Sequence, residues 1–421
     1  MKILVVGNGA REHALVWKIA QSQRVKEIFA LPGNAGTAGM AHNIDISVSN
    51  ISSIVNKAAE LKADLVVVGP EAPLAAGLVD RLEAAGIPVF GPSQKAAQLE
   101  SSKVFARNLM NKKGIPCASG QCFTTCTEAT QYLENRTAPV VVKADGLAAG
   151  KGVIIAITTS EAVSALNSMM QDRIFGAAGE RVIIEECLVG KEVSLLAFSD
   201  GKTTVPMVPA CDYKRVFDGD KGPNTGGMGS YSPPGFFGEE MIRQVLESVI
   251  KPTIAAMAEA GTPYKGVLYT GLILTTRGPM VLEFNARFGD PETQAILPRL
   301  KTDLVDIMLA VVNGNLDKIK IEWDSNPCVG VVMASRGYPG EYRTGFPITV
   351  SDKIDKDINI FYAGAKMRDG GQIVTDGGRI LTVTATGRTM KDARDKVYSN
   401  IKHVNFEGCH YRKDIAAREV S

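Results

Sequence analysis

The chain has 421 residues, of which 45% are hydrophobic and 22% are charged, and its 47 basic and 45 acidic residues leave a net charge of +2. This length exceeds one compact core, so we expect about two or three domains. The balanced charge excludes a strongly basic nucleic-acid-binding stripe, and no apolar run approaches the roughly 18 residues that a membrane span needs.

The cysteines and the N-terminus indicate the cellular compartment. None of the seven cysteines forms a C-x-x-C pair, and no histidine stands beside Cys117, Cys122 and Cys126 to complete a zinc site. The chain opens on an apolar run at 3–6, which is typical of a strand rather than a signal peptide. We therefore expect reduced thiols and a cytoplasmic monomer without nucleic-acid or membrane partners.

The N-terminal segment predicts a phosphate-binding turn. A buried parallel strand at 2–6 is followed by Gly7-Asn8-Gly9 and an amphipathic helix, so backbone N–H groups point to where a phosphate would lie. Glu12 replaces the third glycine of a dinucleotide fingerprint, which favours another phosphate ligand over NAD.

Further strands predicted at 28–31, 65–68 and 89–90 complete an open parallel sheet. The strand at 65–68 runs into Gly69-Pro70-Glu71. Ligands of such sheets bind at the carboxyl ends of the strands, so Glu71 is a candidate substrate contact. The alternative is a carboxylate that interacts with the dipole of a helix start.

A second unit begins with a helix at Lys103 and contains strands at 140–143 and 153–157 joined by a glycine-rich loop. Small residues let the loop backbone approach phosphate oxygens, while Lys143 and Lys151 supply positive charge. The Walker pattern is absent, because the loop returns into a strand instead of opening a helix. A purely structural glycine hairpin is the alternative.

Residues 181–198 predict a buried strand, a short connector at Glu185–Leu188, and a second strand that carries Glu192. The extended backbone of such a connector can offer N–H and C=O groups to an adenine edge, and a carboxylate shortly after it can accept ribose hydroxyls. This segment is the expected third wall of a nucleotide site.

The stretch 281–294 predicts a strand that ends in a Gly-Asp-Pro turn before a helix. Side chains alternate along a strand, so Glu283, Asn285 and Arg287 should share one face. The two oxygen donors suit Mg²⁺, which keeps substrate phosphates as its remaining ligands, and the arginine can clamp an anion. A strand with solvated polar residues is the alternative.

Two more regions complete the chain. The polar segment 212–229, with Asp212, Lys214 and the glycine-rich run 222–229, indicates a functional loop. From about 327 we expect a small α+β domain without a catalytic constellation, which supports the site and closes over the substrate. Its predicted elements are strands at 329–333, 373–374 and 380–386 and a helix at 389–401.

Together these patterns resemble a known family. Residues 101–300 resemble the ATP-grasp ligases, which activate a carboxylate as an acyl phosphate and pass it to a nucleophile. The whole chain is similar to the phosphoribosylamine–glycine ligases. The motifs that carry this likeness are Gly-Asn-Gly-x-Arg-Glu-His at 7–13, Val-Gly-Pro-Glu-Ala-Pro-Leu at 68–74, Lys-Ala-Asp-Gly-Leu-Ala-Ala-Gly-Lys-Gly-Val at 143–153, Gly-Pro-Asn-Thr-Gly-Gly-Met-Gly at 222–229 and Arg-Phe-Gly-Asp-Pro-Glu-Thr-Gln at 287–294.

The resemblance implies an N-terminal α/β domain with an open parallel sheet at 1–100, an ATP-grasp domain at 101–326 and a C-terminal α+β domain at 327–421. Residues of about 120–190 would form a mobile subdomain that covers the nucleotide. The implied reaction joins glycine to 5-phosphoribosylamine through glycyl phosphate, with ATP as co-substrate and Mg²⁺ or Mn²⁺ as cofactor, in de novo purine biosynthesis.

The resemblance also implies roles for individual residues. The ATP-binding set is Lys103, Lys143, Gly146, Gly150, Lys151, Gly152, Glu185, Glu186, Leu188, Glu192 and Lys214. The metal ligands are Glu283 and Asn285, and Tyr269-Thr270-Gly271 on the preceding strand offers no further carboxylate. The substrate contacts are Gly7, Asn8, Gly9, Glu71, Asp212, Arg287 and Asp290. The catalytic candidates are Lys143, Asp212 and Arg287. Asp212 would receive the ammonium group of glycine, and Arg287 would receive the glycine carboxylate or the acyl phosphate. The sequence does not select a general base between Asp145 and Asp212.

Three alternatives remain open at this point. An ATP-grasp ligase with another substrate pair should differ at 212–229 and 287–294. A non-catalytic nucleotide sensor need not keep the lysines and the metal ligands together. A dinucleotide oxidoreductase should have an acidic residue at the end of the second strand, where this chain has Leu31-Pro32-Gly33.

Overall fold

The computed structural model describes residues 1–147 and 152–420. Its N-terminal part is a five-stranded parallel sheet in the order β3-β2-β1-β4-β5, which contains the four predicted strands and the additional strand β3. The strands are β1 (Lys2–Gly7), β2 (Glu27–Pro32), β3 (His42–Asn43), β4 (Leu65–Val68) and β5 (Val89–Phe90), and the helices are α1 (Ala10–Ile19), α2 (Ile51–Leu61), α3 (Glu71–Ala75) and α4 (Leu78–Ala84). Ile3 to Val6 are fully buried because side chains on both faces of β1 enter apolar clusters.

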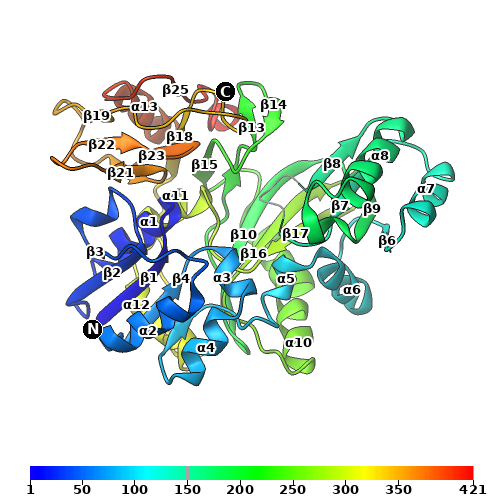
Figure 1. Cartoon of the computed structure of the whole chain (residues 1–421), viewed down its shortest axis with the longest axis horizontal. Helices are drawn as coiled ribbons and strands as arrows, with labels where there is room; N and C mark the ends of the chain where they lie inside the picture. The colour runs from blue at the N-terminus through cyan, green and yellow to red at the C-terminus, as the bar shows by residue number, and fades with distance from the viewer. Residues whose placement is uncertain (148–151, 421) are drawn as a thin grey trace.

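A small unit projects from the rest of the molecule at the right of Figure 1. Helices α5 (Gln98–Ser101) and α6 (Lys103–Lys113) lead into it, and we call residues 120–186 the β6–β9 unit. Its antiparallel sheet has the order β6-β9-β7-β8. The strands are β6 (Gly120–Phe123), β7 (Val140–Ala144), β8 (Val153–Ala156) and β9 (Val182–Glu186), covered by α7 (Cys126–Glu134) and α8 (Thr159–Leu166). The unit has an apolar cluster of its own, separate from the two larger ones.

The middle of the molecule is a four-stranded sheet in the order β11-β10-β16-β17. The strands are β10 (Lys191–Asp200), β11 (Thr204–Pro206), β16 (Lys265–Thr275) and β17 (Gly278–Asn285), and the following helices are α11 (Glu292–Ile296) and α12 (Leu304–Val312). The helix predicted over 239–260 is present but divided, because a π-helical turn at Leu246–Ile250 separates α9 (Glu239–Val245) from α10 (Lys251–Glu259). Pro252, which has no N–H to donate, follows this turn.

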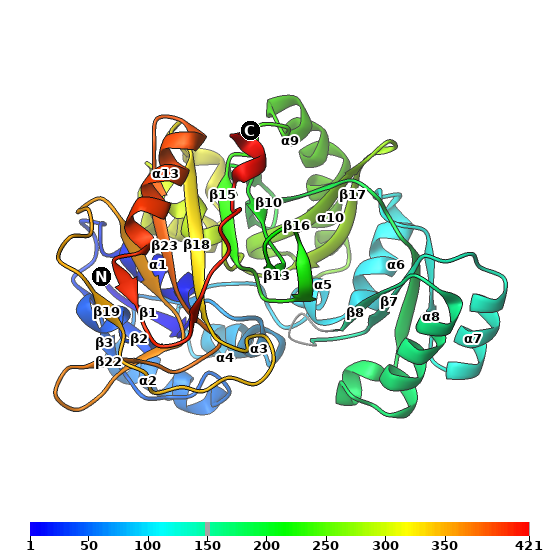
Figure 2. The same ribbon diagram turned by 90° about the horizontal axis from the view of Figure 1, so that it is seen from above.

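The C-terminal sheet contains two strands from far earlier in the chain. Its order is β12-β15-β18-β23-β20, with β25 also paired to β18. The strands are β12 (Cys211–Asp212), β15 (Gly229–Ser232), β18 (Cys328–Ser335), β20 (Asn359–Tyr362), β23 (Arg379–Thr386) and β25 (Cys409–His410), and α13 (Met390–Ile401) packs on them (Figure 2). The expectation of a C-terminal unit from 327 did not include β12 and β15. Asp212 therefore lies on a strand of the C-terminal sheet.

All seven cysteines are free thiols. Among the helices of residues 1–147 and 152–420, none has the length and apolar character that crossing a bilayer requires.

Candidate active site

Lys143 lies where the β6–β9 unit meets the central sheet. Its Nζ atom is 2.7 Å from Oε2 of Glu185 and donates a 3.0 Å hydrogen bond to the carbonyl oxygen of Leu282 on β17. Both charged side chains are almost fully buried. The ammonium group is thus held in one position.

Glu185 and Glu186 belong to strand β9, so the predicted connector at Glu185–Leu188 is placed too early. Glu185 also pairs with the buried Arg107, and Glu186 accepts a 2.7 Å hydrogen bond from the backbone N–H of Ser119. The connector proper begins after Glu186, where Leu188 is half-buried. The side chain of Glu185 therefore organises two cations.

The glycine loop after β7 is anchored to the start of α6. Lys103 donates a 2.9 Å hydrogen bond to the carbonyl oxygen of Gly146, and the carbonyl of Gly152 accepts from Ala144 at 2.8 Å. The carboxylate of Asp145 accepts a 3.1 Å hydrogen bond from the backbone N–H of Val104, in the first turn of α6. It also pairs with Arg181 at 2.5 Å, so both of its oxygens have partners. Gly150 and Lys151 lie outside the described residues.

Glu283 is surrounded by positive charge. Burial would raise the pKa of its carboxyl, but the ammonium groups of Lys214, Lys143 and Lys103 outweigh burial and hold the pKa below its usual value. Asn285 donates a hydrogen bond to the same carboxylate. Glu283 is consequently ionised and available as a hard oxygen ligand.

The donor set fits a metal that shares its ligands with phosphate. No cluster of three or more His, Cys, Asp or Glu side chains with metal-binding geometry occurs in the described part of the chain. Strand β16 places Gly271 opposite Glu283 and Tyr269 opposite Asn285, so the neighbouring strand adds no carboxylate. One carboxylate and one amide suit Mg²⁺, which usually retains water and substrate phosphate oxygens.

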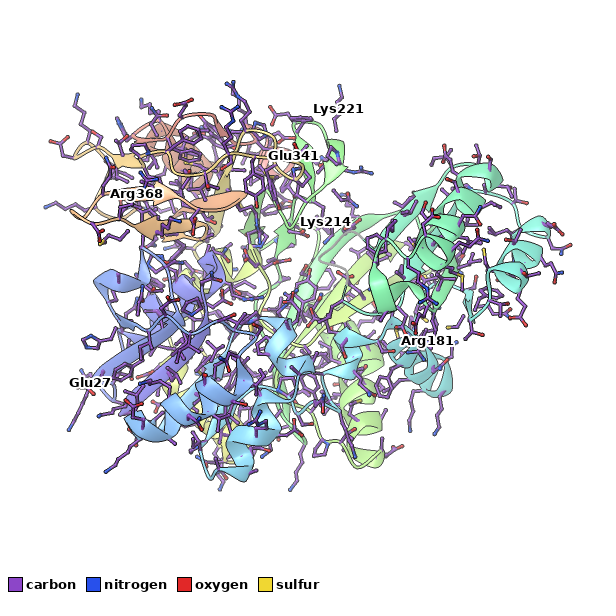
Figure 3. All side chains as sticks on the ribbon, viewed as in Figure 1. Glu27, Arg181, Lys214, Lys221, Glu341 and Arg368 are labelled. Atoms are coloured by element: carbon purple, nitrogen blue, oxygen red, sulfur yellow. The ribbon has the colours of Figure 1, made fainter. Side chains whose placement is uncertain are left out.

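Lys214 joins this group to Asp212. Its Nζ atom lies 3.1 Å from Oδ2 of Asp212 and 4.0 Å from Oε2 of Glu192. Burial alone would lower the pKa of Lys214. The negative charge of Asp212, and to a smaller extent that of Tyr269, Glu192 and Glu283, raises this pKa well above the ordinary value. Figure 3 shows Lys214 towards the middle of the molecule. The structure therefore brings Asp212, Lys214 and Glu192 together.

Glu292 is a carboxyl that the sequence motifs did not single out. It is 3% exposed and accepts hydrogen bonds from the hydroxyls of Tyr269 at 2.9 Å and Ser194 at 3.3 Å. Burial, followed by the charge of Asp212, raises the pKa of Glu292 to about 7. The sequence feature that could have identified Glu292 as a site residue is its position directly after the Gly-Asp-Pro turn.

Arg287 does not share the face of Glu283 and Asn285, because β17 ends at Asn285 and the chain turns. The guanidinium instead pairs with Glu71 at 2.9 Å and with the buried Glu100 at 3.1 Å. Burial would lower the pKa of Arg287, but the two carboxylates raise it. Arg287 and Glu71 thus form a second cluster, at the junction of the N-terminal sheet with the central sheet.

The Gly7-Asn8-Gly9 turn is closed by Glu12. The backbone N–H of Gly9 donates to Glu12 Oε2 at 2.7 Å, and Arg11 Nε lies 2.6 Å from Oε1 of the same carboxylate. A Cβ atom on Gly7, Gly9 or Gly69 would lie 2.4, 2.7 or 2.1 Å from an atom of Glu12. The N–H of Gly9 is therefore occupied and is not the open phosphate donor that the glycine pattern predicts.

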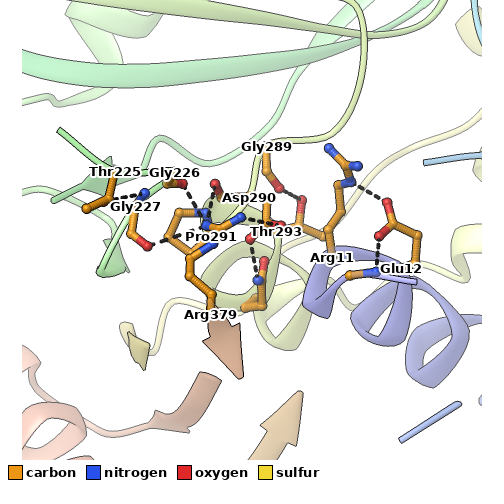
Figure 4. A network of polar contacts seen from close by, with 12 residues as sticks. Arg11, Glu12, Thr225, Gly226, Gly227, Gly289, Asp290, Pro291, Thr293 and Arg379 are labelled. Carbon is orange, nitrogen blue, oxygen red and sulfur yellow. Dashed lines mark hydrogen bonds and ion pairs between the residues drawn. The ribbon is translucent and has the colours of Figure 1, made fainter. Parts of the chain in front are cut away.

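The C-terminal domain reaches the site through Arg379 (Figure 4). Its guanidinium pairs with Oδ2 of Asp290 at 3.0 Å and donates to the carbonyl oxygen of Gly226 at 2.6 Å. Asp290 also accepts from Gln294 at 2.9 Å. Arg379 could not be singled out from the sequence, because it belongs to no recognisable motif.

Comparison with known proteins accounts for this arrangement. Three family models match, described as the N domain, the ATP-grasp (A) domain and the C domain of phosphoribosylglycinamide synthetase, at residues 1–100, 101–293 and 328–418. The chain belongs to the phosphoribosylglycinamide synthetase family.

Individual relatives agree with the family models over nearly the whole of this chain. The phosphoribosylamine–glycine ligase of Caldanaerobacter subterraneus is 48% identical over 417 residues, covering 99% of this chain and 100% of that protein. The Escherichia coli K12 enzyme of the same name is 47% identical over 425 residues, covering 100% and 99%. The trifunctional purine biosynthetic protein adenosine-3 of Gallus gallus is 49% identical over 425 residues, which are 42% of that protein.

Solved structures share the architecture. The crystal structure of phosphoribosylamine–glycine ligase from Thermotoga maritima matches with a TM-score of 0.88 and 34% identity, covering 99% of this chain and all of that one. A biotin carboxylase domain of the Hydrogenobacter thermophilus 2-oxoglutarate carboxylase, solved with MgADP, matches with a TM-score of 0.75 at 17% identity over 97% of this chain and 91% of that one, and indicates the fold alone.

Proposed function

We propose that this chain catalyses the ATP-dependent ligation of glycine to 5-phosphoribosylamine, giving glycinamide ribonucleotide, ADP and phosphate in de novo purine biosynthesis. The observation that carries the proposal is the gathering of Lys103, Lys143 and Lys214 around the carboxylate of Glu283. Lys143 also pairs with Glu185 and Lys214 with Asp212, so these ammonium groups are held in place and supply the positive charge that the phosphates of a nucleotide require. Membership of the phosphoribosylglycinamide synthetase family supports the choice of substrates.

In the first step a carboxylate oxygen of glycine attacks the γ-phosphorus of ATP, and the bond to the ADP oxygen breaks. Phosphoryl transfer depends on positioning and charge neutralisation more than on a protein nucleophile. Lys103 and Lys143 would hold the phosphates, while Glu185 fixes the direction of Lys143. Glu186, Leu188 and Glu192 line the path expected for the nucleoside.

In the second step the 1-amino nitrogen of phosphoribosylamine attacks the acyl carbon of glycyl phosphate. The C–N bond forms, the C–O bond breaks with its electron pair leaving on phosphate, and the nitrogen loses a proton. Asp212, which lies 3.1 Å from Lys214, or Glu292, whose pKa burial raises to about 7, would accept this proton. The Gly7–Gly9 turn, through the exposed Asn8, and Glu71 would contact phosphoribosylamine, and Arg287 and Asp290 would complete the substrate contacts.

Glu283 and Asn285 would hold a divalent metal, Mg²⁺ or Mn²⁺. Such an ion, when bound, neutralises charge on the phosphates. The β6–β9 unit would cover the nucleotide and exclude water from the acyl phosphate, which its separate apolar cluster supports. We further propose a cytoplasmic monomer whose partners are small molecules.

The reaction is tested by ADP release with Mg·ATP, glycine and freshly generated phosphoribosylamine, each omitted in turn. We expect ADP formation that requires all three components and is not supported when alanine or aspartate replaces glycine. Tight ATP binding without turnover under every combination would move the protein to another substrate pair or to a nucleotide sensor.

A further inference from the structure

Arg379 is a half-buried cation that comes from the C-terminal sheet and ends among groups of the ATP-grasp domain. Its Nη1 atom donates to the carbonyl oxygens of Gly226 at 2.6 Å, Gly227 at 3.4 Å and Asp290 at 3.4 Å. Its Nη2 atom donates to Oδ2 of Asp290 at 3.0 Å. One planar guanidinium thereby connects the glycine-rich loop 222–229 with the Gly-Asp-Pro turn.

The loop is shaped to accept this guanidinium. Gly227 has φ +111°, and a Cβ atom there would lie 2.3 Å from Cδ of Pro291. A Cβ atom on Gly226 would lie 3.1 Å from Cζ of Arg379. Tyr338, also from the C-terminal domain, accepts a 2.9 Å hydrogen bond from the N–H of Gly226. The two glycines are needed because the loop is enclosed between Arg379 and Pro291.

The same contact lies against the N-terminal turn. A Cβ atom on Gly9 would be 3.6 Å from Oδ2 of Asp290, the oxygen that Arg379 binds. Figure 4 shows Arg379 and Asp290 between Gly226 and Gly227 on one side and the Arg11–Glu12 pair on the other. Elements of all three domains therefore meet at one ion pair.

We propose that Arg379 is a positioning residue for the amine substrate, fixing Asp290 and the 222–229 loop relative to the Gly9 turn. This inference rests on the proposed function, which places the Gly7–Gly9 turn at phosphoribosylamine and Asp290 among the substrate contacts. The guanidinium of Arg379 binds Gly226, Gly227 and Asp290, none of which belongs to the group around Lys143 and Glu185. Loss of Arg379 should then lower kcat/KM for the amine substrate and leave KM for ATP nearly unchanged.

The test compares Arg379→Ala, Arg379→Lys and Asp290→Asn with the wild type, and Arg388→Ala, an exposed arginine of the same domain, is the control. For Arg379→Ala we expect kcat/KM for phosphoribosylamine to fall on the order of 10²-fold, because a small displacement of a substrate-positioning group has an effect of this size. KM for ATP should stay within about twofold of the wild-type value. Guanidinium chloride at non-denaturing concentration should restore part of the activity of Arg379→Ala but none of that of Asp290→Asn. Arg379→Lys, which keeps the charge but loses the fork, should retain an intermediate activity.

Three results decide the matter. An Arg379→Ala protein with normal kcat/KM for phosphoribosylamine would overturn the proposal. So would equal losses for ATP, glycine and phosphoribosylamine together with a lower Tm, since these would indicate general destabilisation. If Arg379→Ala does not fold, the same substrate-selective loss in Arg379→Lys supports the proposal, and its absence overturns it. A wild-type protein without ADP release would instead refute the proposed function.

Discussion

The ammonium group of Lys143 lies 2.7 Å from the carboxylate of Glu185, which also pairs with Arg107. All three side chains are at most 9% exposed. Among the residues that the structure describes, Glu185 is the carboxylate that pairs with both buried cations, so its removal should destabilise the fold more than the removal of either cation. This ion-pair group connects the β6–β9 unit, which carries Lys143 and Glu185, to helix α6.

The first prediction contrasts the two ends of this ion pair. Glu185→Gln should destabilise the fold by about 3–5 kcal/mol, because two buried cations lose their counter-charge. Lys143→Met should cost less stability, since Glu185 keeps Arg107, but should slow turnover on the order of 10²–10³-fold. Urea unfolding and steady-state rates measure the two effects. A Glu185→Gln protein as stable as Lys143→Met would contradict this account.

The second prediction concerns the metal ligands. Glu283→Ala should bind Mg·ATP poorly and turn over very slowly, because an oxygen ligand is lost among three lysines. Isothermal titration with Mg·ATP and ADP release measure these effects, and Glu341→Ala, an exposed glutamate of the C-terminal domain, is the control. Near-normal activity of Glu283→Ala would remove the metal assignment.

The third prediction concerns His13, which joins the N-terminal and C-terminal domains. Its Nδ1 atom accepts a 2.8 Å hydrogen bond from the N–H of Tyr362, and burial lowers its pKa from 6.5 to about 4. The unfolded chain therefore binds more protons than the folded protein between these values, so stability falls as the pH decreases through the window. The loss should total about 3 kcal/mol. His13→Asn, which keeps an acceptor but does not titrate, should lose this dependence, whereas His42→Asn at an exposed position should retain it.

Glu292 should show the opposite pH dependence. Its folded pKa of about 7 lies above the ordinary 4.5, so the folded protein retains a proton that the unfolded chain has lost between these values. The contribution of Glu292 to stability is therefore greatest below the window and declines as the pH rises through it. Glu292→Gln, which preserves an acceptor for Tyr269, should become more stable relative to the wild type from pH 4.5 to 7. A constant difference across this range would show that Glu292 is already ionised in the folded protein.

The fold was predictable where burial leaves a periodic signal. The apolar run of β1 and the return of β8 into a strand after the glycine loop both follow from local pattern, and both are observed. The pairing of β15 with β18 was not predictable, because it joins segments separated by about 100 residues. The sequence pattern of each strand requires a neighbouring strand but does not specify which one.

The site was predictable where the residues form local motifs and less so where partners are distant. Glu283 and Asn285 follow from strand alternation, but Arg287 does not, since the strand ends between them. Glu185 has the pattern of a connector residue, yet tertiary contacts with Arg107 and Lys143 draw it into β9. Arg379 lies 89 positions from Asp290, so only the folded chain reveals their contact.

The most direct test of the central claim follows the oxygen atoms of glycine. If the chain forms glycyl phosphate, a carboxylate oxygen becomes bonded to the γ-phosphorus and stays there when the amine displaces phosphate. With glycine labelled by ¹⁸O at both carboxylate positions, mass spectrometry of the products should find one ¹⁸O in each phosphate and one in each glycinamide ribonucleotide. Unlabelled phosphate released alongside the ligated product would contradict an acyl phosphate pathway.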